Sequence, residues 1–256
     1  MSFFKVENIS ISFGGVKALN EIAFEVNKGE IFSIIGPNGS GKTTLFNCIS
    51  GIYKPTNGKI LFNESNIMGK NPHNIAKLGI ARTFQNIELF PYMNTMENLM
   101  IGRHIYMKTG IFRAAFMLGR KSFAAKEESF HREKVEEIME LLDLQSFRNR
   151  FVGGLPYGVQ KRIELGRALA LEPKILLLDE PCAGMTSDEK EDMIFLVQDI
   201  LEILGVTILL IEHDMKVVMD ISNRILAINF GSPIVIGKPQ VVQNHPEVLK
   251  AYLGEE

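Results

Sequence analysis

The sequence lacks the features that would direct it out of the cell or through a membrane. Its 256 residues contain no tryptophan and two cysteines, Cys48 and Cys182, which form neither a disulfide framework nor a metal-binding spacing. No run approaches the roughly 20 apolar residues that span a bilayer. The N-terminus has no charged segment followed by an apolar run and a cleavage site. We therefore expect a protein of the reducing cytoplasm, for which any membrane role needs a separate membrane partner.

An excess of positive charge is also missing. Lys and Arg number 28 against 30 Asp and Glu, so the net charge is -2 and no basic surface for nucleic acid is predicted. Hydrophobic residues make up 46% of the chain, which is enough for one substantial core or for a core with a smaller lobe. Partners other than nucleic acid are therefore expected.

Three kinds of pattern follow one another along the chain. Residues 3–35 alternate apolar and polar positions in short runs, which is typical of antiparallel strands, and end in the continuous apolar run 31–35, which is typical of a strand buried on both faces. Residues 97–147 show helical spacing. Strands are then expected at 174–178, 206–211 and 224–230, alternating with helices at 187–204 and 215–221. This order predicts a parallel α/β core with an N-terminal antiparallel β subdomain and a helical insertion.

A glycine-rich loop follows the strand expected at 31–35. It fits the phosphate-loop pattern of Gly, four residues, Gly, Lys and Ser or Thr: Gly36, Pro37, Asn38, Gly39, Ser40, Gly41, Lys42, Thr43 and Thr44. In such a loop, backbone N–H groups and a helix N-terminus face phosphates, the lysine lies near the β and γ phosphates, and the first threonine binds Mg²⁺. A glycine turn without a ligand is the alternative, and the position between a buried strand and a helix argues against it.

Two carboxylates, Asp179 and Glu180, end the apolar run 175–178. After a strand, an acidic residue is more often a helix cap. Together with the loop at Lys42, the pair predicts phosphoryl transfer, with Asp179 reaching the metal shell and Glu180 polarising the attacking water. We expect these carboxylates to lie close to Lys42 on an adjacent strand.

A third motif makes the chain resemble the ATPase subunits of ABC transporters over nearly its whole length. Residues 155–160, read with the helix that continues to 169, resemble the signature loop and helix of that family. The resemblance implies a phosphate-loop NTPase (RecA-like) core and a single ABC ATPase domain over 1–256. Its nucleotide-binding core and β subdomain would span 1–90 and 156–256, with the α-helical signature subdomain at 91–155. It also implies that Pro156, Tyr157 and Gly158 face the γ phosphate held by a partner subunit.

The same resemblance assigns three further residues. Gln85 would sense Mg²⁺ and the attacking water, His213 would contact the γ phosphate, and Phe13 would stack on adenine. Taken alone, an exposed glutamine, a structural histidine and a core phenylalanine are the ordinary interpretations. With Lys42 and Glu180, the first two complete the expected catalytic set.

The chain departs from the family pattern at two places. Pro156 and Tyr157 stand where the signature usually carries Ser and Gly, which removes a hydroxyl and a backbone donor. Residues 182–186 lack the aspartate that is common in the wider family. Two outcomes are open for the first departure, slower hydrolysis or compensation by other donors, and the second could alter communication between the sites. The chain keeps Lys42, Asp179 and Glu180, so we predict catalytic competence.

Several segments point to a subgroup. Residues 102–104, 157–158, 183–185 and 244–254 look like those of the LivG-type ATPases of branched-chain amino acid uptake systems. The resemblance implies ATP and Mg²⁺ as ligands, a second ATPase subunit, identical or homologous, integral permease subunits, and indirectly a substrate-binding protein. The chain would lie at the cytoplasmic face of the membrane as a peripheral subunit. The apolar stretch 111–121 is expected to pack as a helix or to touch the permease or lipid.

Other functions remain possible from the residues. A lipid or lipopolysaccharide exporter ATPase would have a similar size, whereas soluble ABC ATPases of ribosomes or DNA repair usually fuse two cassettes or carry basic patches. A purely regulatory nucleotide sensor is disfavoured by Glu180. The expected mechanism has two ATP molecules clamped between two subunits, whose closure moves the attached permease.

Overall fold

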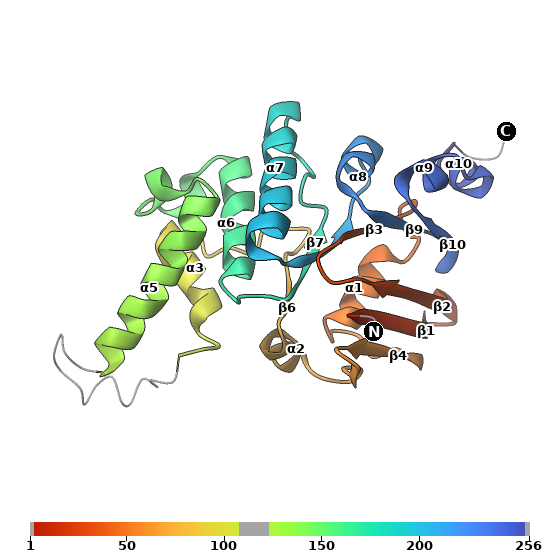
Figure 1. Cartoon of the computed structure of the whole chain (residues 1–256), viewed down its shortest axis with the longest axis horizontal. Coiled ribbons are helices and arrows are strands. Elements are labelled where there is room, and N and C mark those ends of the chain that lie inside the picture. The colour runs from red at the N-terminus through yellow and green to blue at the C-terminus, as the bar shows by residue number, and fades with distance from the viewer. Residues whose placement is uncertain (1–2, 108–122, 254–256) are drawn as a thin grey trace. The chain divides into compact units, whose positions relative to one another are not determined.

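The computed structural model describes residues 3–107 and 123–253, and its chain forms two compact units. The first unit comprises residues 1–85, 174–184 and 190–256, and the second comprises 86–173 and 185–189. Figure 1 shows the elements of each. The stretch 111–121, expected as a packed helix or a contact surface, lies outside the described residues. None of the described helices combines the length and apolar character that a membrane crossing needs.

An antiparallel sheet opens the first unit. Its strands lie in the order β2-β1-β4-β5, and each neighbouring pair is antiparallel. The expected N-terminal β subdomain is confirmed. Alternate residues of β1 and β2 are buried, because side chains of a strand point to opposite faces and one face of this sheet covers the core. The strands are β1 (Phe4–Phe13), β2 (Val16–Val26), β4 (Asn57–Phe62) and β5 (Ser65–Asn66).

A second, six-stranded sheet carries the glycine-rich loop and the two carboxylates, Asp179 and Glu180. Its order is β10-β9-β3-β8-β7-β6, parallel from β9 to β6, with β10 antiparallel to β9. Every residue of β3, β7 and β8 is buried, as their apolar runs predicted. The strands are β3 (Ile31–Ile35), β6 (Ile80–Arg82), β7 (Ile175–Asp179), β8 (Thr207–Ile211), β9 (Arg224–Asn229) and β10 (Ser232–Gly237).

This strand order corrects one prediction. The strand that ends in the carboxylates, β7, is not adjacent to β3, because β8 pairs with both and lies between them. Sequence order does not reveal which strand enters the middle of a parallel sheet, since each crossover can pass over an existing strand. The loop that follows β8 consequently lies between the other two.

Helices complete the first unit. Leu45, Phe46 and Ile49 of α1 are fully buried and share one apolar cluster with strands of both sheets, so α1 is fixed on both sides. The helix α7 ends at Leu204, where Gly205 adopts a positive φ of 65° and closes the end, as expected. The helices are α1 (Lys42–Ile49), α2 (Pro72–Leu78), α7 (Ser187–Leu204, whose first three residues group with the second unit), α8 (Met215–Ile221), α9 (Pro239–Gln243) and α10 (Pro246–Leu253).

The second unit is helical, and its helices α3 and α5 lie within the segment 97–147 for which helical spacing predicted helices. It contains α3 (Thr95–Arg103), α5 (Phe123–Leu141) and α6 (Tyr157–Leu169), with short 3-10 turns at Gln145–Phe147 and Val152–Gly154. A capping box begins α3. Its last residue, Arg103, is fully buried and donates to the Ala170 carbonyl and to His131 Nδ1, which ties α3 to α5 and to the end of α6.

Candidate functional site

The glycine loop at 36–41 leads directly from β3 into α1. A Cβ atom on Gly36 would lie 2.2 Å from the Ile228 carbonyl oxygen, and one on Gly41 would lie 2.6 Å from the Ala18 carbonyl oxygen. Gly39 and Gly41 also have positive φ angles of 79° and 105°. Because only glycine tolerates both the crowding and these angles, the sequence determines the course of this loop.

Donor groups collect where the loop meets α1. No side chain caps this helix, and the N–H groups of Lys42, Thr43 and Thr44 in its first turn have no acceptor within the helix. Lys42 as a whole is 6% exposed, and its ammonium donates to the carbonyl oxygens of Gly36 and Pro37 at 2.8 and 2.9 Å. Burial lowers the pKa of Lys42, and the Glu180 and Asp179 carboxylates oppose that shift. This arrangement suits a phosphate chain.

The carboxylate of Asp179 has a partner that the sequence did not suggest. It is 1% exposed, and its Oδ2 accepts from Arg82 NH2 at 2.7 Å. Arg82 also donates to Asn47 Oδ1 and Ser50 Oγ, so α1, β6 and β7 are linked through one guanidinium. Because the Arg82 guanidinium already occupies one oxygen of the Asp179 carboxylate, we expect Asp179 to reach a metal ion through water.

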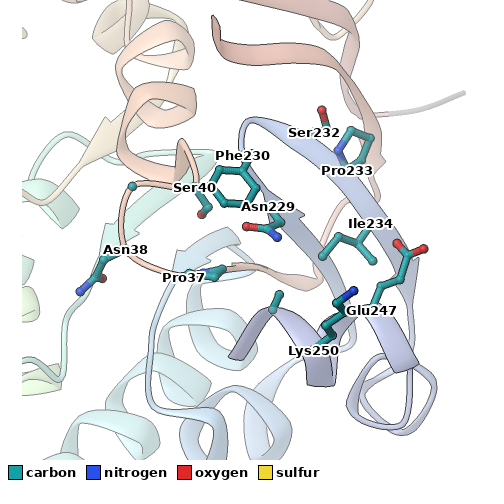
Figure 2. Close-up of a pocket in the computed structure, with 12 residues that line it drawn as sticks. Pro37, Asn38, Ser40, Asn229, Phe230, Ser232, Pro233, Ile234, Glu247 and Lys250 are labelled. Carbon is teal, nitrogen blue, oxygen red and sulfur yellow. The ribbon is translucent and has the colours of Figure 1, made fainter. Parts of the chain in front are cut away.

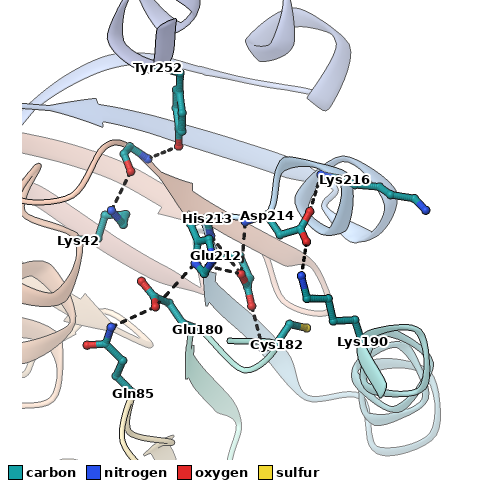
Figure 3. A network of polar contacts seen from close by, with 11 residues as sticks. Lys42, Gln85, Glu180, Cys182, Lys190, Glu212, His213, Asp214, Lys216 and Tyr252 are labelled. Atoms are coloured by element: carbon teal, nitrogen blue, oxygen red, sulfur yellow. Dashed lines mark hydrogen bonds and ion pairs between the residues drawn. The ribbon is translucent and has the colours of Figure 1, made fainter. Parts of the chain in front are cut away.

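The Glu180 carboxylate lies at the centre of the expected catalytic group (Figure 3). Gln85 Nε2 donates to its Oε2 at 3.0 Å, and His213 Nδ1 lies 3.7 Å from the same oxygen. The structure thus brings together three residues that are far apart in the sequence. The φ angle of Glu180 is 51°, a left-handed conformation that costs an L residue about 1–2 kcal/mol. Such strain is usual where a side chain must point at a reacting group.

Sequence reasoning missed Glu212, which organises the loops around Glu180. It directly follows β8, is fully buried, and accepts hydrogen bonds from the backbone N–H groups of Cys182 at 2.8 Å and His213 at 3.1 Å. The first bond fixes the chain just after Glu180, and the second fixes the loop of the histidine. An acidic residue at the end of an apolar strand could have signalled this role.

The substitution Glu212→Gln tests this arrangement. One oxygen becomes an NH₂ group that cannot accept, so one backbone N–H loses its partner, and we expect the free energy of unfolding to fall by about 1–3 kcal/mol. We also expect kcat for ATP hydrolysis to fall while ATP binding persists, because the change lies beside Glu180 and away from Lys42. Urea denaturation and steady-state assays measure both effects.

A matched control is Glu30→Gln. The Glu30 carboxylate is also buried and also accepts from a backbone N–H, that of Asn27 at 2.7 Å, but it lies at the opposite end of β3. This variant should lose stability with kcat unchanged. An equal loss of kcat in both variants would mean that Glu212 acts only through stability.

The remaining predicted residues are divided between the two units, with Phe13 in the first. Phe13 is 44% exposed and meets Tyr53 edge-on at 5.1 Å between centroids, which leaves ring surface for a base. In the second unit, Pro156 is the N-cap of α6 without a side-chain cap bond, and Tyr157 is exposed. A Cβ on Gly158 would lie 2.5 Å from Glu189 Oε1. Contacts of these residues with nucleotide stay predictions.

No cluster of three or more His, Cys, Asp or Glu side chains in the described segments could hold a metal ion by itself. Mg²⁺ at nucleotide sites is commonly bound by one or two protein ligands together with phosphate oxygens and water. Thr43 and Gln85 are exposed, and Asp179 is anchored, so these three residues fit that kind of binding.

A glycine loop between a buried strand and a helix, with two carboxylates ending a strand of the same parallel sheet, defines a phosphate-loop ATPase. Comparison with known proteins narrows this class: residues 19–183 match the profile of the ABC transporter family. Residues 232–256 match that of the branched-chain amino acid ATP-binding cassette transporters. The chain belongs to the ABC transporter ATP-binding family.

Individual relatives and solved structures support the same family assignment. The chain is 41% identical to the high-affinity branched-chain amino acid transport ATP-binding protein LivG of Salmonella typhimurium, over 98% of this chain and 97% of that protein. A crystal structure of an ATP-binding cassette of an ABC transporter in its ADP conformation superposes with a TM-score of 0.86 at 34% identity, covering all of both chains. A dimeric post-hydrolysis cassette bound to ADP and Pi gives 0.73 at 26% identity, covering 92% of this chain and 98% of that one. The predicted family, fold and ATPase class are confirmed.

Proposed function

We propose that this chain is the ATP-hydrolysing subunit of a transporter that takes up branched-chain amino acids. The observation that carries the proposal is the similarity to LivG over nearly the full length of both chains. The match of residues 232–256 to the branched-chain subgroup supports it independently, because this segment lies outside the part that matches the general family.

Two such subunits would form two composite nucleotide sites. The uncapped start of α6, with Pro156, Tyr157 and Gly158, would be offered to the γ phosphate bound at Lys42 of the other subunit, identical or homologous. The dimeric ADP and Pi cassette supports pairing. The subunits would lie at the cytoplasmic face of the membrane against integral permease subunits, with a substrate-binding protein acting on the permease.

Each side chain of the candidate site would then have a defined role in ATP binding or hydrolysis. Lys42 and the loop N–H groups neutralise and orient the phosphates, and Phe13 stacks on adenine. Thr43, Gln85 and, through water, Asp179 would hold Mg²⁺, which neutralises charge on the phosphates. Glu180 accepts a proton from the attacking water, while Gln85 and His213 hold its carboxylate and the γ phosphate in position.

Reconstitution tests the transport proposal. The chain is expressed together with the genes that neighbour its own, and the membrane protein that copurifies with it is reconstituted with it in lipid vesicles. These vesicles enclose ATP and Mg²⁺ on the side where the ATPase subunit lies. We expect leucine, isoleucine or valine uptake that requires both ATP and the binding protein. Arginine serves as the control substrate and should not be taken up. Lipid movement, or ATP turnover that ignores the amino acid and its binding protein, would contradict the proposal.

A further inference from the structure

The C-terminal helix α10 reaches the phosphate loop through one tyrosine. The Tyr252 hydroxyl accepts a hydrogen bond from the backbone N–H of Gly36 at 2.8 Å (Figure 3). Burial raises the pKa of Tyr252, so the hydroxyl stays neutral at pH 7. The two residues are 216 positions apart in the sequence, and Gly36 is the first residue of the loop that follows β3.

Gly36 is held from two sides. Tyr252 takes its N–H, and its carbonyl oxygen accepts from the Lys42 ammonium at 2.8 Å. The residue has no room for a Cβ, since the Ile228 carbonyl oxygen and Ser40 Oγ would lie 2.2 and 2.6 Å away. The orientation of this one residue therefore decides where an acceptor of the Lys42 ammonium is placed.

Packing joins α10 to the strand before the loop, because Val248 of this helix is buried in one apolar cluster with Ile35, but the side of the helix next to the loop itself is open. A cavity of about 740 Å³ lies beside the loop, lined by Pro37 to Ser40 on one side and by Glu247, Lys250 and Ala251 of α10 on another (Figure 2). The loop and this part of the helix face each other across open space. A directional contact from Tyr252 is therefore well suited to fix the start of the loop.

We infer that Tyr252 is a positioning residue of the nucleotide site, which sets the affinity for ATP by holding Gly36 and, through it, Lys42. The inference rests on the proposed role of the loop as the nucleotide site. The tyrosine lies in the segment 232–256 that matches the branched-chain subgroup, so the C-terminal tail contributes to the ATP site of the same chain.

Loss of the Tyr252 hydroxyl should change the affinity for ATP more than the rate of the chemical step. Gly36 and Lys42 belong to the phosphate-binding part of the site, whereas Glu180, Gln85 and His213 form a separate group that Tyr252 does not touch in the hydrogen-bond network. Removing the hydroxyl frees the Gly36 peptide to turn, and part of the ATP binding energy is then used to restore its orientation.

The variant Tyr252→Phe tests the inference in the full chain. Loss of one hydrogen bond should raise the KM and the equilibrium Kd for ATP about three- to tenfold, with kcat within about twofold of the unaltered protein. Calorimetric titration with ATP in the absence of Mg²⁺ gives the Kd, and phosphate release gives kcat and KM.

The matched control is Tyr106→Phe. Tyr106 and Tyr252 are each 37% exposed, and each hydroxyl bonds to the backbone, that of Tyr106 to the Leu171 carbonyl in the second unit. Tyr106→Phe should leave Kd and KM unchanged. An unaltered Kd in Tyr252→Phe, a fall in kcat alone, or an equal shift in the control would overturn the inference. Failure of the unaltered protein to bind ATP would instead overturn the proposed function.

Discussion

The variant Lys42→Ala is expected to lose ATP binding. The lysine is the buried cation of the loop, and its ammonium, held by the Gly36 and Pro37 carbonyl oxygens, would also donate to oxygens of the β and γ phosphates. Charge-assisted hydrogen bonds contribute about 1.5–3 kcal/mol each, so the loss of two should weaken binding about 10²-fold or more. Calorimetric titration with ATP measures the change, and steady-state hydrolysis should fall with it at any practical ATP concentration.

Lys5→Ala is the comparison variant. Lys5 also pairs with carboxylates, those of Glu7 and Glu25, but it lies partly exposed on the antiparallel sheet. Its removal should leave ATP affinity unchanged. Retention of near-normal affinity in Lys42→Ala would show that the nucleotide does not occupy the loop at 36–44, and the account of the site would then fail.

The variant Glu180→Gln is expected to bind ATP and to hydrolyse it about 10²–10⁴ times more slowly. The amide keeps the size of the side chain and can still accept from Gln85, but it cannot take a proton from water. Bound ATP then persists, and the proposed dimer should accumulate because the γ phosphate that holds it closed is not lost. Phosphate release measures the rate, and size-exclusion chromatography with ATP and Mg²⁺ measures the dimer.

A second glutamate-to-glutamine variant in the first unit serves as the control for the loss of one negative charge. Glu202 is exposed on α7, and Glu202→Gln should hydrolyse ATP at the normal rate without retaining a dimer. If Glu180→Gln kept its full steady-state rate, Glu180 would not be the group that activates water.

Much of the fold follows from local sequence patterns. Continuous apolar runs identify β3, β7 and β8, because a strand buried on both faces has no polar alternation. Gly205 marks the end of α7. The order of strands in the sheet did not follow, since the position of β8 between β3 and β7 depends on how the crossovers pack together and no single segment encodes it.

The residues of the candidate site also include some that local sequence patterns predict and some that they do not. Lys42, Asp179 and Glu180 carry signals in contiguous motifs. The family resemblance assigned Gln85 and His213 to the reaction site, and the structure adds that both lie beside Glu180. The contacts of Arg82, Glu212 and Tyr252 join distant elements through single side chains. An arginine in a short strand, a glutamate after an apolar run and a tyrosine in a tail are common in any sequence, so only three-dimensional proximity distinguishes them.

The left-handed backbone of Glu180 has a consequence for the history of such proteins. A glycine at this position would avoid the cost of about 1–2 kcal/mol and lose about 0.5–1 kcal/mol through the greater entropy of its unfolded chain, so we expect a small net gain in stability. Selection for thermal stability alone would therefore favour replacement of Glu180. A glutamate in this strained conformation is explained by the requirement for ATP turnover, so a more stable variant altered at this position is expected to hydrolyse ATP poorly.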